Sequence, residues 1–288
     1  MTRVGWIGLG AMGAPMARVV ARDHELVAFD IVPGAAAGLA GAGATAAATI
    51  AEAADGVDVV AIMVATPDQV ESVLFGDDGV AASVGPETVV MIMGTVGPEP
   101  MARWAALLPR IVDAPVSGGV ARASTGDLLM MFSGSDADVV RTESVRTAVA
   151  SRSARVGAAP GDGQKVKLVN QLLCGAHIAV AAEALAFATA MGLDARECWE
   201  VIRHGAAASF MLDDRGRRML DEDFDDPRSA IDIFVKDMGL VTTAAADGGA
   251  WTPIATTAGA LFREARDRGL GRKDDSSLIT VLRDRPSS

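Results

Sequence analysis

Short apolar runs alternate with segments of mixed character along the first half of the chain. Two of the runs, VVAIMV and TVVMIM, are apolar at every position or nearly so, with no polar alternation. This is typical of strands in a parallel sheet covered by helices on both faces, and strands that alternate with helices indicate βαβ units. The pattern predicts strands at Arg3–Gly8, Glu25–Asp30, Asp58–Val64, Thr88–Met93, Arg110–Asp113 and Leu128–Ser133, a helix after Ser135 and a short strand near Arg152–Val156.

The pattern changes at Gln164. From there to about Ala190 the chain is apolar on most faces, with Gly175 as its one glycine and no proline. A helix this long and apolar is expected to lie between domains or subunits. Gly192 is placed to end it. Asp194 is placed to cap the next helix, and further helices follow, with breaks near Gly205, Pro227, Gly248 and Pro253.

The two halves therefore predict different architectures. Residues 1–160 are expected to form a doubly wound α/β sheet domain, and residues 161–288 an all-α domain joined to it by the long helix at about 164–190. A chain of 288 residues suits two domains better than one core.

Composition narrows the functional classes. A net charge of −11, with no basic stripe, argues against nucleic-acid binding. Two cysteines and three histidines without metal-like spacing predict no metal site. We find no secretory signal and no apolar run of roughly 18 residues, and so expect a cytoplasmic protein without a membrane span. The absence of tyrosine excludes the Tyr and Lys mechanism of short-chain dehydrogenases.

A glycine motif follows the first predicted strand. Gly8, Gly10 and Gly13 form GxGxxG at the point where a helix should begin, near Ala11. In such a Rossmann fingerprint the first glycine makes the tight turn, the second lets the backbone approach a pyrophosphate, and the third allows close helix packing. We expect the loop residues to bind a dinucleotide: Gly8, Leu9, Gly10, Ala11, Met12 and Gly13.

Asp30 ends the second predicted strand, where an acidic residue can accept a hydrogen bond from the ribose 2′-hydroxyl. Its charge would repel a 2′-phosphate, and no Arg or Lys occurs in Ile31–Thr45 to attract one. The sequence therefore favours NAD over NADP. The alternative is that Asp30 only caps the turn that contains Pro33 and Gly34.

Lys167 is the leading candidate for proton transfer. It lies early in the long helix, and Asn170 follows about 4.5 Å along the same face. A lysine that faces a cleft between domains can have its pKa lowered by burial, which suits it to exchange a proton with a substrate oxygen. On spacing alone a solvated helical lysine remains the alternative.

Four motifs in order resemble the β-hydroxyacid dehydrogenases, which include 3-hydroxyisobutyrate dehydrogenase, tartronate semialdehyde reductase and L-threonate dehydrogenase. They are GLGAMGAPM, DAPVSGGVARASTGDL, GDGQKVKLVNQ and FVKDMGL, and KDDSSL follows near the end. Together they span nearly the whole chain. The resemblance implies an oxidoreductase that moves a hydride between a small hydroxyacid and NAD, and that forms homodimers or homotetramers.

The resemblance also implies roles for individual residues. Lys167 would be the catalytic lysine, and Asn170 would orient the substrate. The loop Ser117, Gly118 and Gly119 would hold the substrate carboxylate. Lys236 would reach the substrate and the cofactor from the second domain. Val64, Ala65 and Thr95 would line the nicotinamide.

For two of these groups a purely structural role stays open. Ser117 to Gly119 could be only a tight turn, and Lys236 with Asp237 only a solvated helix pair. His177 lies off the Lys167 face and is read as a core or subunit-contact residue. The chain also departs from the family, because Gly94 replaces a serine before Thr95 and Ala65 replaces a common proline. Both changes concern cofactor affinity.

The substrate is the least determined feature. The stretch from Gly205 to Val241, and SAIDIFVKD within it, resembles the L-threonate branch of the family more than the 3-hydroxyisobutyrate branch. We expect a sugar acid such as L-threonate, with Ser209 and Phe210 at the far end of its pocket. The alternatives are 3-hydroxyisobutyrate dehydrogenase or tartronate semialdehyde reductase, then an imine reductase, which should lack the lysine, or a non-catalytic NAD-binding protein.

Overall fold

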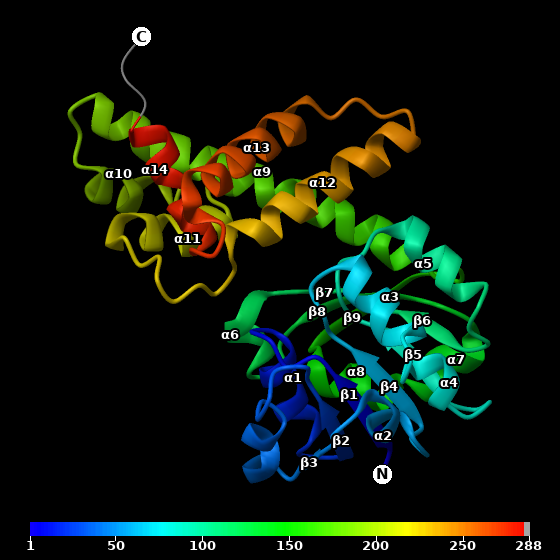
Figure 1. Cartoon of the computed structure of the whole chain (residues 1–288). Coiled ribbons are helices and arrows are strands. Elements are labelled where there is room, and N and C mark those ends of the chain that lie inside the picture. Colours follow the sequence, from blue (N-terminus) through cyan, green and yellow to red (C-terminus); the bar gives the residue numbers. More distant parts are fainter. Residues whose placement is uncertain (285–288) are drawn as a thin grey trace. The chain divides into compact units, whose positions relative to one another are not determined.

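The computed structural model describes residues 1–284, and it divides into two compact units. Unit 1 comprises residues 1–167 and unit 2 residues 168–288. Unit 1 is the α/β part, drawn from blue to green in Figure 1, and unit 2 is helical. The predicted fold class, a Rossmann-type sheet followed by an all-α domain, is confirmed.

A single mixed sheet runs through unit 1 in the order β3-β2-β1-β4-β5-β6-β8-β7, with β9 paired to β8. The strands from β3 to β6 are parallel, as βαβ units require. β8 runs antiparallel to β6 and β7. The strands are β1 Arg3–Ile7, β2 Glu25–Phe29, β3 Thr45–Ala46, β4 Val59–Ile62, β5 Val89–Ile92, β6 Ile111–Asp113, β7 Val116–Ser117, β8 Leu129–Ser133 and β9 Arg152–Gly157.

The central strands are apolar at every position because they contribute to two cores. Along β4, Val59 and Ala61 join one hydrophobic cluster, whereas Val60 and Ile62 join another. Since successive side chains point to opposite faces of a sheet, the two clusters occupy its two faces. They lie beneath α1 Gly13–Val20, α2 Ile50–Ala54, α3 Pro67–Phe75, α4 Val80–Ser83, α5 Pro98–Ala105, α6 Gly119–Ala123, α7 Asp136–Arg141 and α8 Glu143–Val149 (Figure 1).

The long helix α9 spans Asp162–Ala190, two residues more at its start than the pattern predicted. Gly192 follows it with a φ of 78°, a conformation that favours glycine. Gly175 has a packing role in mid-helix, because a Cβ there would lie 2.2 Å from the Met238 Sδ. The remaining helices are α10 Ala195–Ile202, α11 Phe210–Asp221, α12 Ile231–Asp247, α13 Pro253–Ala265 and α14 Leu278–Arg283, with short turns at Ala37–Ala42, Arg266–Leu270 and Asp275–Ser277.

By length and composition α9 could cross a membrane, contrary to the expectation that no stretch was long and apolar enough. Its inner face, however, belongs to the core of unit 2. Ile178, Ala182 and Leu185 are fully buried there with Phe234 and Phe262, whose rings stack at 5.1 Å. The core helix of a soluble protein satisfies the same length and composition test.

The KDDSSL segment near the end of the chain is buried and ionic. Asp274 and Asp275 are fully enclosed and pair with Arg218 and Arg215 of α11. The same segment binds the backbone that leads into α12, because the Asp275 amide donates to the Ser229 carbonyl at 2.7 Å. The cluster thus joins α11, the start of α12 and the C-terminal turn.

Candidate active site

The glycine loop after β1 has the shape that its sequence predicts. Gly8 has a φ of 98°, and a Cβ there would lie 2.4 Å from the Met63 carbonyl oxygen. A Cβ on Gly13 would lie 2.1 Å from the Gly8 carbonyl oxygen. A Cβ on Gly10 would have no neighbour within 4 Å. Two glycines therefore permit close backbone packing, while the middle one leaves the outer side of the loop open.

Asp30 stands at the end of β2, half-buried, and both of its carboxylate oxygens accept hydrogen bonds. Oδ2 accepts from the Leu9 amide at 2.6 Å and Oδ1 from the Val32 amide at 2.7 Å. The residue thus caps the following turn and also holds the glycine loop. Each oxygen has a second lone pair, so these bonds leave room for ribose hydroxyl donors.

The loops after β4 and β5 lie against each other. A Cβ on Gly94 would lie 2.6 Å from the Val64 carbonyl oxygen. Glycine at this position therefore has a packing reason, because a side chain would push the Val64 loop away. In the first loop, the Ala65 amide donates to the Gln69 Oε1 at 2.9 Å, as part of a capping box that starts α3. Thr95 is half-buried in the second loop.

Ser117 ends β7, and the two glycines after it form a turn that needs them. Gly118 has a φ of 141° and Gly119 a φ of 75°. The tight-turn reading is therefore correct as a description of the backbone. Such a turn can also present amides to an anion, so a carboxylate-binding role stays a prediction.

Lys167 is buried, with 6% of its surface exposed, in the second turn of α9. It is not a solvated helical lysine. Lys165, two residues earlier, is exposed and pairs with Asp162 at 2.8 Å. The two lysines thus occupy opposite environments on one helix, and the buried one is the candidate for chemistry.

Sequence reasoning missed two buried polar residues that hold the start of α9. Asp113, at the end of β6, and Gln164, in the first turn of α9, are fully enclosed and bonded to each other at 2.8 Å. Burial raises the pKa of Asp113 from 3.8 to about 6, although hydrogen bonds from Gln164, Gly161 and Ser133 oppose the rise.

Unit 2 holds a chain of polar side chains on α9 and α12. Asn170 Nδ2 donates to Gln171 Oε1 at 2.8 Å, and Gln171 Nε2 donates to the Asp237 carboxylate. Lys236 Nζ lies 2.8 Å from Asp237 Oδ1. Because Asp237 is buried and Lys236 is half-buried, these two do not form a solvated pair. Gln171 and Asp237 were not predicted, and Asp237 could have been noticed as an acid beside the predicted Lys236.

Ser209 and Phe210 lie at the start of α11. Ser209 is the N-cap, and its Oγ accepts from the Leu212 amide at 3.0 Å. Phe210 is 55% exposed. Both residues line a hollow of about 470 Å³ with Arg203, His204, Ala208 and Asp213. Neither Asn170 nor Lys236 lines this hollow. The structure therefore does not bring Ser209 and Phe210 together with Asn170 and Lys236. His177 is exposed on α9, so it is not a core residue, and its alternative role as a subunit contact stays a prediction.

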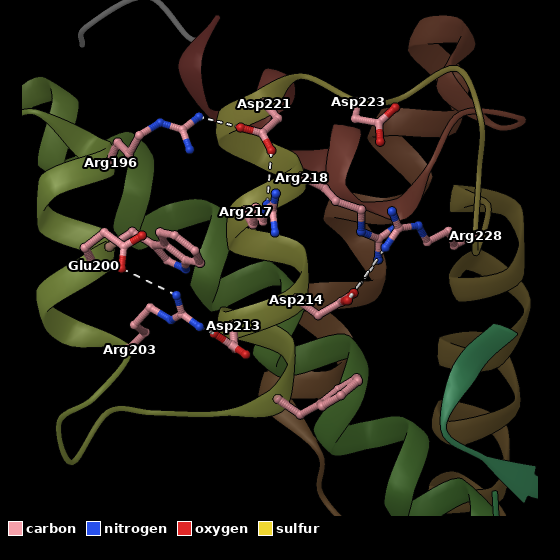
Figure 2. A pocket seen from close by; sticks show the side chains of 12 residues that line it. Arg196, Glu200, Arg203, Asp213, Asp214, Arg217, Arg218, Asp221, Asp223 and Arg228 are labelled. Carbon is pink, nitrogen blue, oxygen red and sulfur yellow. Dashed lines mark hydrogen bonds and ion pairs between the residues drawn. The ribbon is translucent and has the colours of Figure 1, made fainter. Parts of the chain in front are cut away.

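A larger hollow of about 570 Å³ lies between α10, α11 and the segment after α11. Figure 2 shows that its side chains face one another in ion pairs, such as Arg196 with Asp221 and Arg203 with Glu200. Five arginines line it and so do five acidic residues. Because the charges are balanced and paired, this hollow offers little excess charge to a ligand.

The residues of unit 1 fit a nicotinamide dinucleotide. Gly10 leaves the space into which a pyrophosphate could come against the backbone, and Asp30 is held where a ribose would follow. The loops that carry Val64 and Thr95 lie at the carboxyl ends of β4 and β5, the edge at which ligands bind in such sheets. The fit concerns both NAD and NADP, since the pyrophosphate and nicotinamide halves are the same.

Comparison with known proteins covers almost the whole chain. Residues 3–157 match the family described as the NAD binding domain of 6-phosphogluconate dehydrogenase. Residues 161–282 match the family described as NAD-binding of NADP-dependent 3-hydroxyisobutyrate dehydrogenase.

Individual relatives are similar over their full length. An L-threonate dehydrogenase of Cupriavidus necator is 41% identical, with 97% of this chain and 95% of the relative covered. A 2-hydroxy-3-oxopropionate reductase of Escherichia coli is 33% identical, with 97% of both covered. A crystal structure of a 3-hydroxyisobutyrate dehydrogenase from Salmonella typhimurium is 41% identical, with a TM-score of 0.92 and with 98% of this chain and 100% of that chain covered.

Proposed function

The chain belongs to the 3-hydroxyisobutyrate dehydrogenase-like family of NAD(P)-dependent β-hydroxyacid dehydrogenases, and we propose that within this family it oxidises L-threonate with Lys167 as general acid/base. It is an oxidoreductase that acts on CH–OH groups. The observation that carries the assignment of the lysine is its burial in α9, one turn after Gln164, whose side chain accepts a hydrogen bond from the loop after β5.

The proposed chemistry needs a base at the substrate hydroxyl. When bound, NAD(P)⁺ accepts a hydride from the carbon that carries the hydroxyl group. The unprotonated amine of Lys167 accepts the hydroxyl proton as the hydride leaves, and the protonated amine returns it to the carbonyl oxygen in the reverse direction. Because the side chain is buried, it is held in few conformations, which suits a group that must meet one oxygen.

Other residues hold and orient the substrate in this proposal. Ser117 and the amides of Gly118 and Gly119 bind the carboxylate. Asn170 and Lys236 orient the substrate, and the bonds of Gln171 and Asp237 to these two residues limit their movement. In this proposal Lys236 also contacts the bound cofactor. Ser209 and Phe210 remain candidates for substrate specificity, with Ser209 acting through its cap on α11.

L-threonate is favoured because several relatives with that name are 36–41% identical over nearly the whole chain. The 2-hydroxy-3-oxopropionate reductase is less similar, at 33%. The 3-hydroxyisobutyrate dehydrogenase structure, at 41%, keeps that substrate as the second candidate.

The test is NADH or NADPH formation, followed at 340 nm, with L-threonate, 3-hydroxyisobutyrate, L-serine and 2-(hydroxymethyl)glutarate as substrates, and reduction of 2-hydroxy-3-oxopropionate. We expect the highest kcat/KM with L-threonate. A higher value with 3-hydroxyisobutyrate would replace the substrate and keep the reaction. No turnover of any acid, with NADH still bound, would contradict the proposed reaction.

The cofactor proposed is NAD, on the basis of the Asp30 carboxylate and the absence of basic residues in Ile31–Thr45. Asp30→Asn removes the charge but keeps an oxygen for the Leu9 amide. We expect the ratio of kcat/KM for NAD to that for NADP to fall about tenfold or more, because about 1.4 kcal/mol of lost repulsion corresponds to that factor.

Asp58→Asn is the matched control for Asp30→Asn. Asp58 is also a carboxylate that accepts from a backbone amide, that of Arg3 at 2.8 Å, but it precedes β4 at the opposite end of the strands. Its substitution should leave the cofactor ratio unchanged. If Asp30→Asn leaves the ratio unchanged too, Asp30 does not determine the choice of cofactor.

We assign the protein to the cytoplasm and expect it to form a homodimer or homotetramer. Five large apolar side chains are exposed along α9, at a spacing of three, four or seven residues: Val166, Val169, Leu173, Val180 and Phe187. Such a stripe suits contact with a second copy. Light scattering should give at least twice the mass of 29.5 kDa, and a monomeric mass at micromolar concentration would contradict this expectation.

A further inference from the structure

A buried polar cluster in unit 1 connects four segments that are separate in sequence. It consists of Asp113 at the end of β6, Ser133 at the end of β8, Gln164 in α9 and the loop Gly94–Gly97 after β5. The three side chains have no exposed surface. We call it the Asp113–Gln164 cluster.

Asp113 and Ser133 satisfy the first amides of α9. The Asp113 Oδ2 accepts from the Gly161 amide at 3.0 Å and from the Gln164 amide at 2.9 Å. The Ser133 Oγ accepts from the Gly163 amide at 3.0 Å and itself donates to Asp113 Oδ2 at 3.3 Å. These amides precede the helical hydrogen bonds, which begin with the Lys165 amide on the Gly161 carbonyl. The start of α9 is thereby bound to two strands of the sheet.

The close approach leaves no room for a side chain at Gly163. A Cβ there would lie 2.8 Å from Asp113 Oδ2 and 2.8 Å from the Met131 carbonyl oxygen. The second glycine of GDGQK therefore lets the helix lie against the carboxylate.

Gln164 connects the helix to the loop after β5. Its Oε1 accepts from the Val96 amide at 2.9 Å and the Gly97 amide at 3.1 Å. Its Nε2 donates to the Gly94 carbonyl at 3.1 Å and to Asp113 Oδ1 at 2.8 Å. Both lone pairs and both hydrogens of the amide are used. The amide cannot be rotated by 180° without placing donor against donor and acceptor against acceptor.

The cluster connects the loop after β5 to the part of α9 that carries Lys167. Lys167 follows Gln164 by three residues, about 4.5 Å along the helix and on the same side. Thr95 lies between Gly94 and Val96, both of which Gln164 binds. We propose that Asp113 and Gln164 are positioning residues, which hold the catalytic lysine against the nicotinamide side of the cofactor site without touching the substrate.

This inference rests on the proposed role of Lys167 and goes beyond it. A cap alone would only need an acceptor at the helix start, such as a serine on the helix itself. Here the acceptor is Asp113, which belongs to the sheet. Gln164 in the first turn of the helix donates a hydrogen bond back to Asp113 and another to the loop after β5. A small displacement of such a helix would change proton and hydride transfer, since misplacement by about 1 Å can cost about 100-fold.

The test exchanges donor and acceptor within the cluster. In Asp113→Asn, the new NH₂ group faces either Gln164 Nε2, which is also a donor, or the main-chain amides of Gly161 and Gln164. At least one of these hydrogen bonds is therefore lost in either orientation. Gln164→Glu turns an oxygen toward Asp113 Oδ1. We expect each to lower kcat at least about tenfold, while the Kd of NADH changes by less than about threefold. In the double variant D113N/Q164E the Asn amide can donate to the Glu carboxylate, so a part of the lost kcat should return.

Asp138→Asn is the matched control. Asp138 is also a buried carboxylate of unit 1, paired with Arg110 at 2.8 Å, but it lies in α7. Its substitution should lower Tm and leave kcat at 25 °C unchanged. The deuterium isotope effect on kcat, measured with substrate labelled at the reacting carbon, should rise in the two cluster variants and not in the control.

The outcomes separate the positioning role from a purely structural one. If D113N and Q164E lower Tm as D138N does and keep kcat and the isotope effect of the wild type, the proposal is overturned. If the fold-decrease in kcat of the double variant equals the product of the two single fold-decreases, the bond between Asp113 and Gln164 does not position the lysine. Lys167→Met is measured alongside, and turnover by that variant at the rate of the wild type would refute the proposed role of the lysine instead.

Discussion

Lys167→Met should lower kcat for the oxidation of the hydroxyacid by about 10²- to 10⁴-fold, the usual contribution of a general acid/base. Methionine fills a similar volume in the buried site but cannot take a proton. The affinity for NADH should stay within a few fold, since the lysine is assigned to the substrate hydroxyl. Steady-state rates at 340 nm and fluorescence titration with NADH measure the two quantities.

Lys165→Met is the internal control for this substitution. Lys165 lies on the same helix two residues earlier, but it is exposed and pairs with Asp162. Its loss should leave kcat unchanged. Equal rates in Lys167→Met and the wild type would mean that the acid/base is another residue. Addition of small primary amines to Lys167→Ala offers a further test, because partial return of turnover would indicate a missing proton carrier.

The sheet could be predicted because its strands carry two cores. A strand such as Val59–Ile62 is apolar at every position. A short run of this kind between helical segments is typical of a central strand in a parallel sheet. β3 and β7, by contrast, have two residues each, too few for any periodicity to appear. They were missed for that reason.

Helix ends were predictable where one side chain forms the cap. Asp194 accepts from the Arg196 and Glu197 amides, as its position before a helix indicated. Ser209 has the same signature before an apolar run, yet it was interpreted as a pocket residue. The start of α9 was placed two residues late, because Asp113, which holds it, lies 51 residues before Gln164.

The candidate site could be predicted only as far as motifs reach. The glycine loop and Asp30 follow from local spacing, and their contacts agree with it. The cluster around Asp113 has no such signal, since a buried aspartate and a buried glutamine become partners only through the fold. The replacement of a serine by Gly94 predicts an effect on cofactor affinity. The structure adds a packing reason for the glycine, against the Val64 carbonyl.

The buried ion pairs of unit 2 provide the second large effect. Arg215 binds Asp275 through Nε and Nη2, both at 3.1 Å, and Asp275 has no exposed surface. Arg215→Met should reduce the free energy of unfolding by about 3–5 kcal/mol, because it leaves the buried carboxylate of Asp275 with only the longer ion pair to Arg218, at 3.8 Å. With about 2–4 °C lost per kcal/mol, Tm should fall by about 6–20 °C.

Arg217→Met controls for the loss of an arginine from the same helix. Arg217 is 72% exposed in its side chain and lies 3.5 Å from Asp221. Exposed pairs of this kind contribute about 1 kcal/mol or less, so Tm should barely change. The double variant R215M/D275N also removes the buried negative charge and should recover much of the stability, because an enclosed pair contributes little beyond an apolar replacement of its size.

The pH dependence of stability distinguishes the effect of a buried charge that has lost its main partner from the effect of lost packing. Burial raises the pKa of Asp275, and Arg215 opposes that rise. Without Arg215 the pKa rises further, so the folded state of Arg215→Met holds a proton that the unfolded state releases above about pH 4. Its stability should therefore fall more steeply than that of the wild type as the pH increases from 4 to 7. Urea unfolding at several pH values measures this, and a loss of stability that is the same at every pH would point to packing and not to the charge of Asp275.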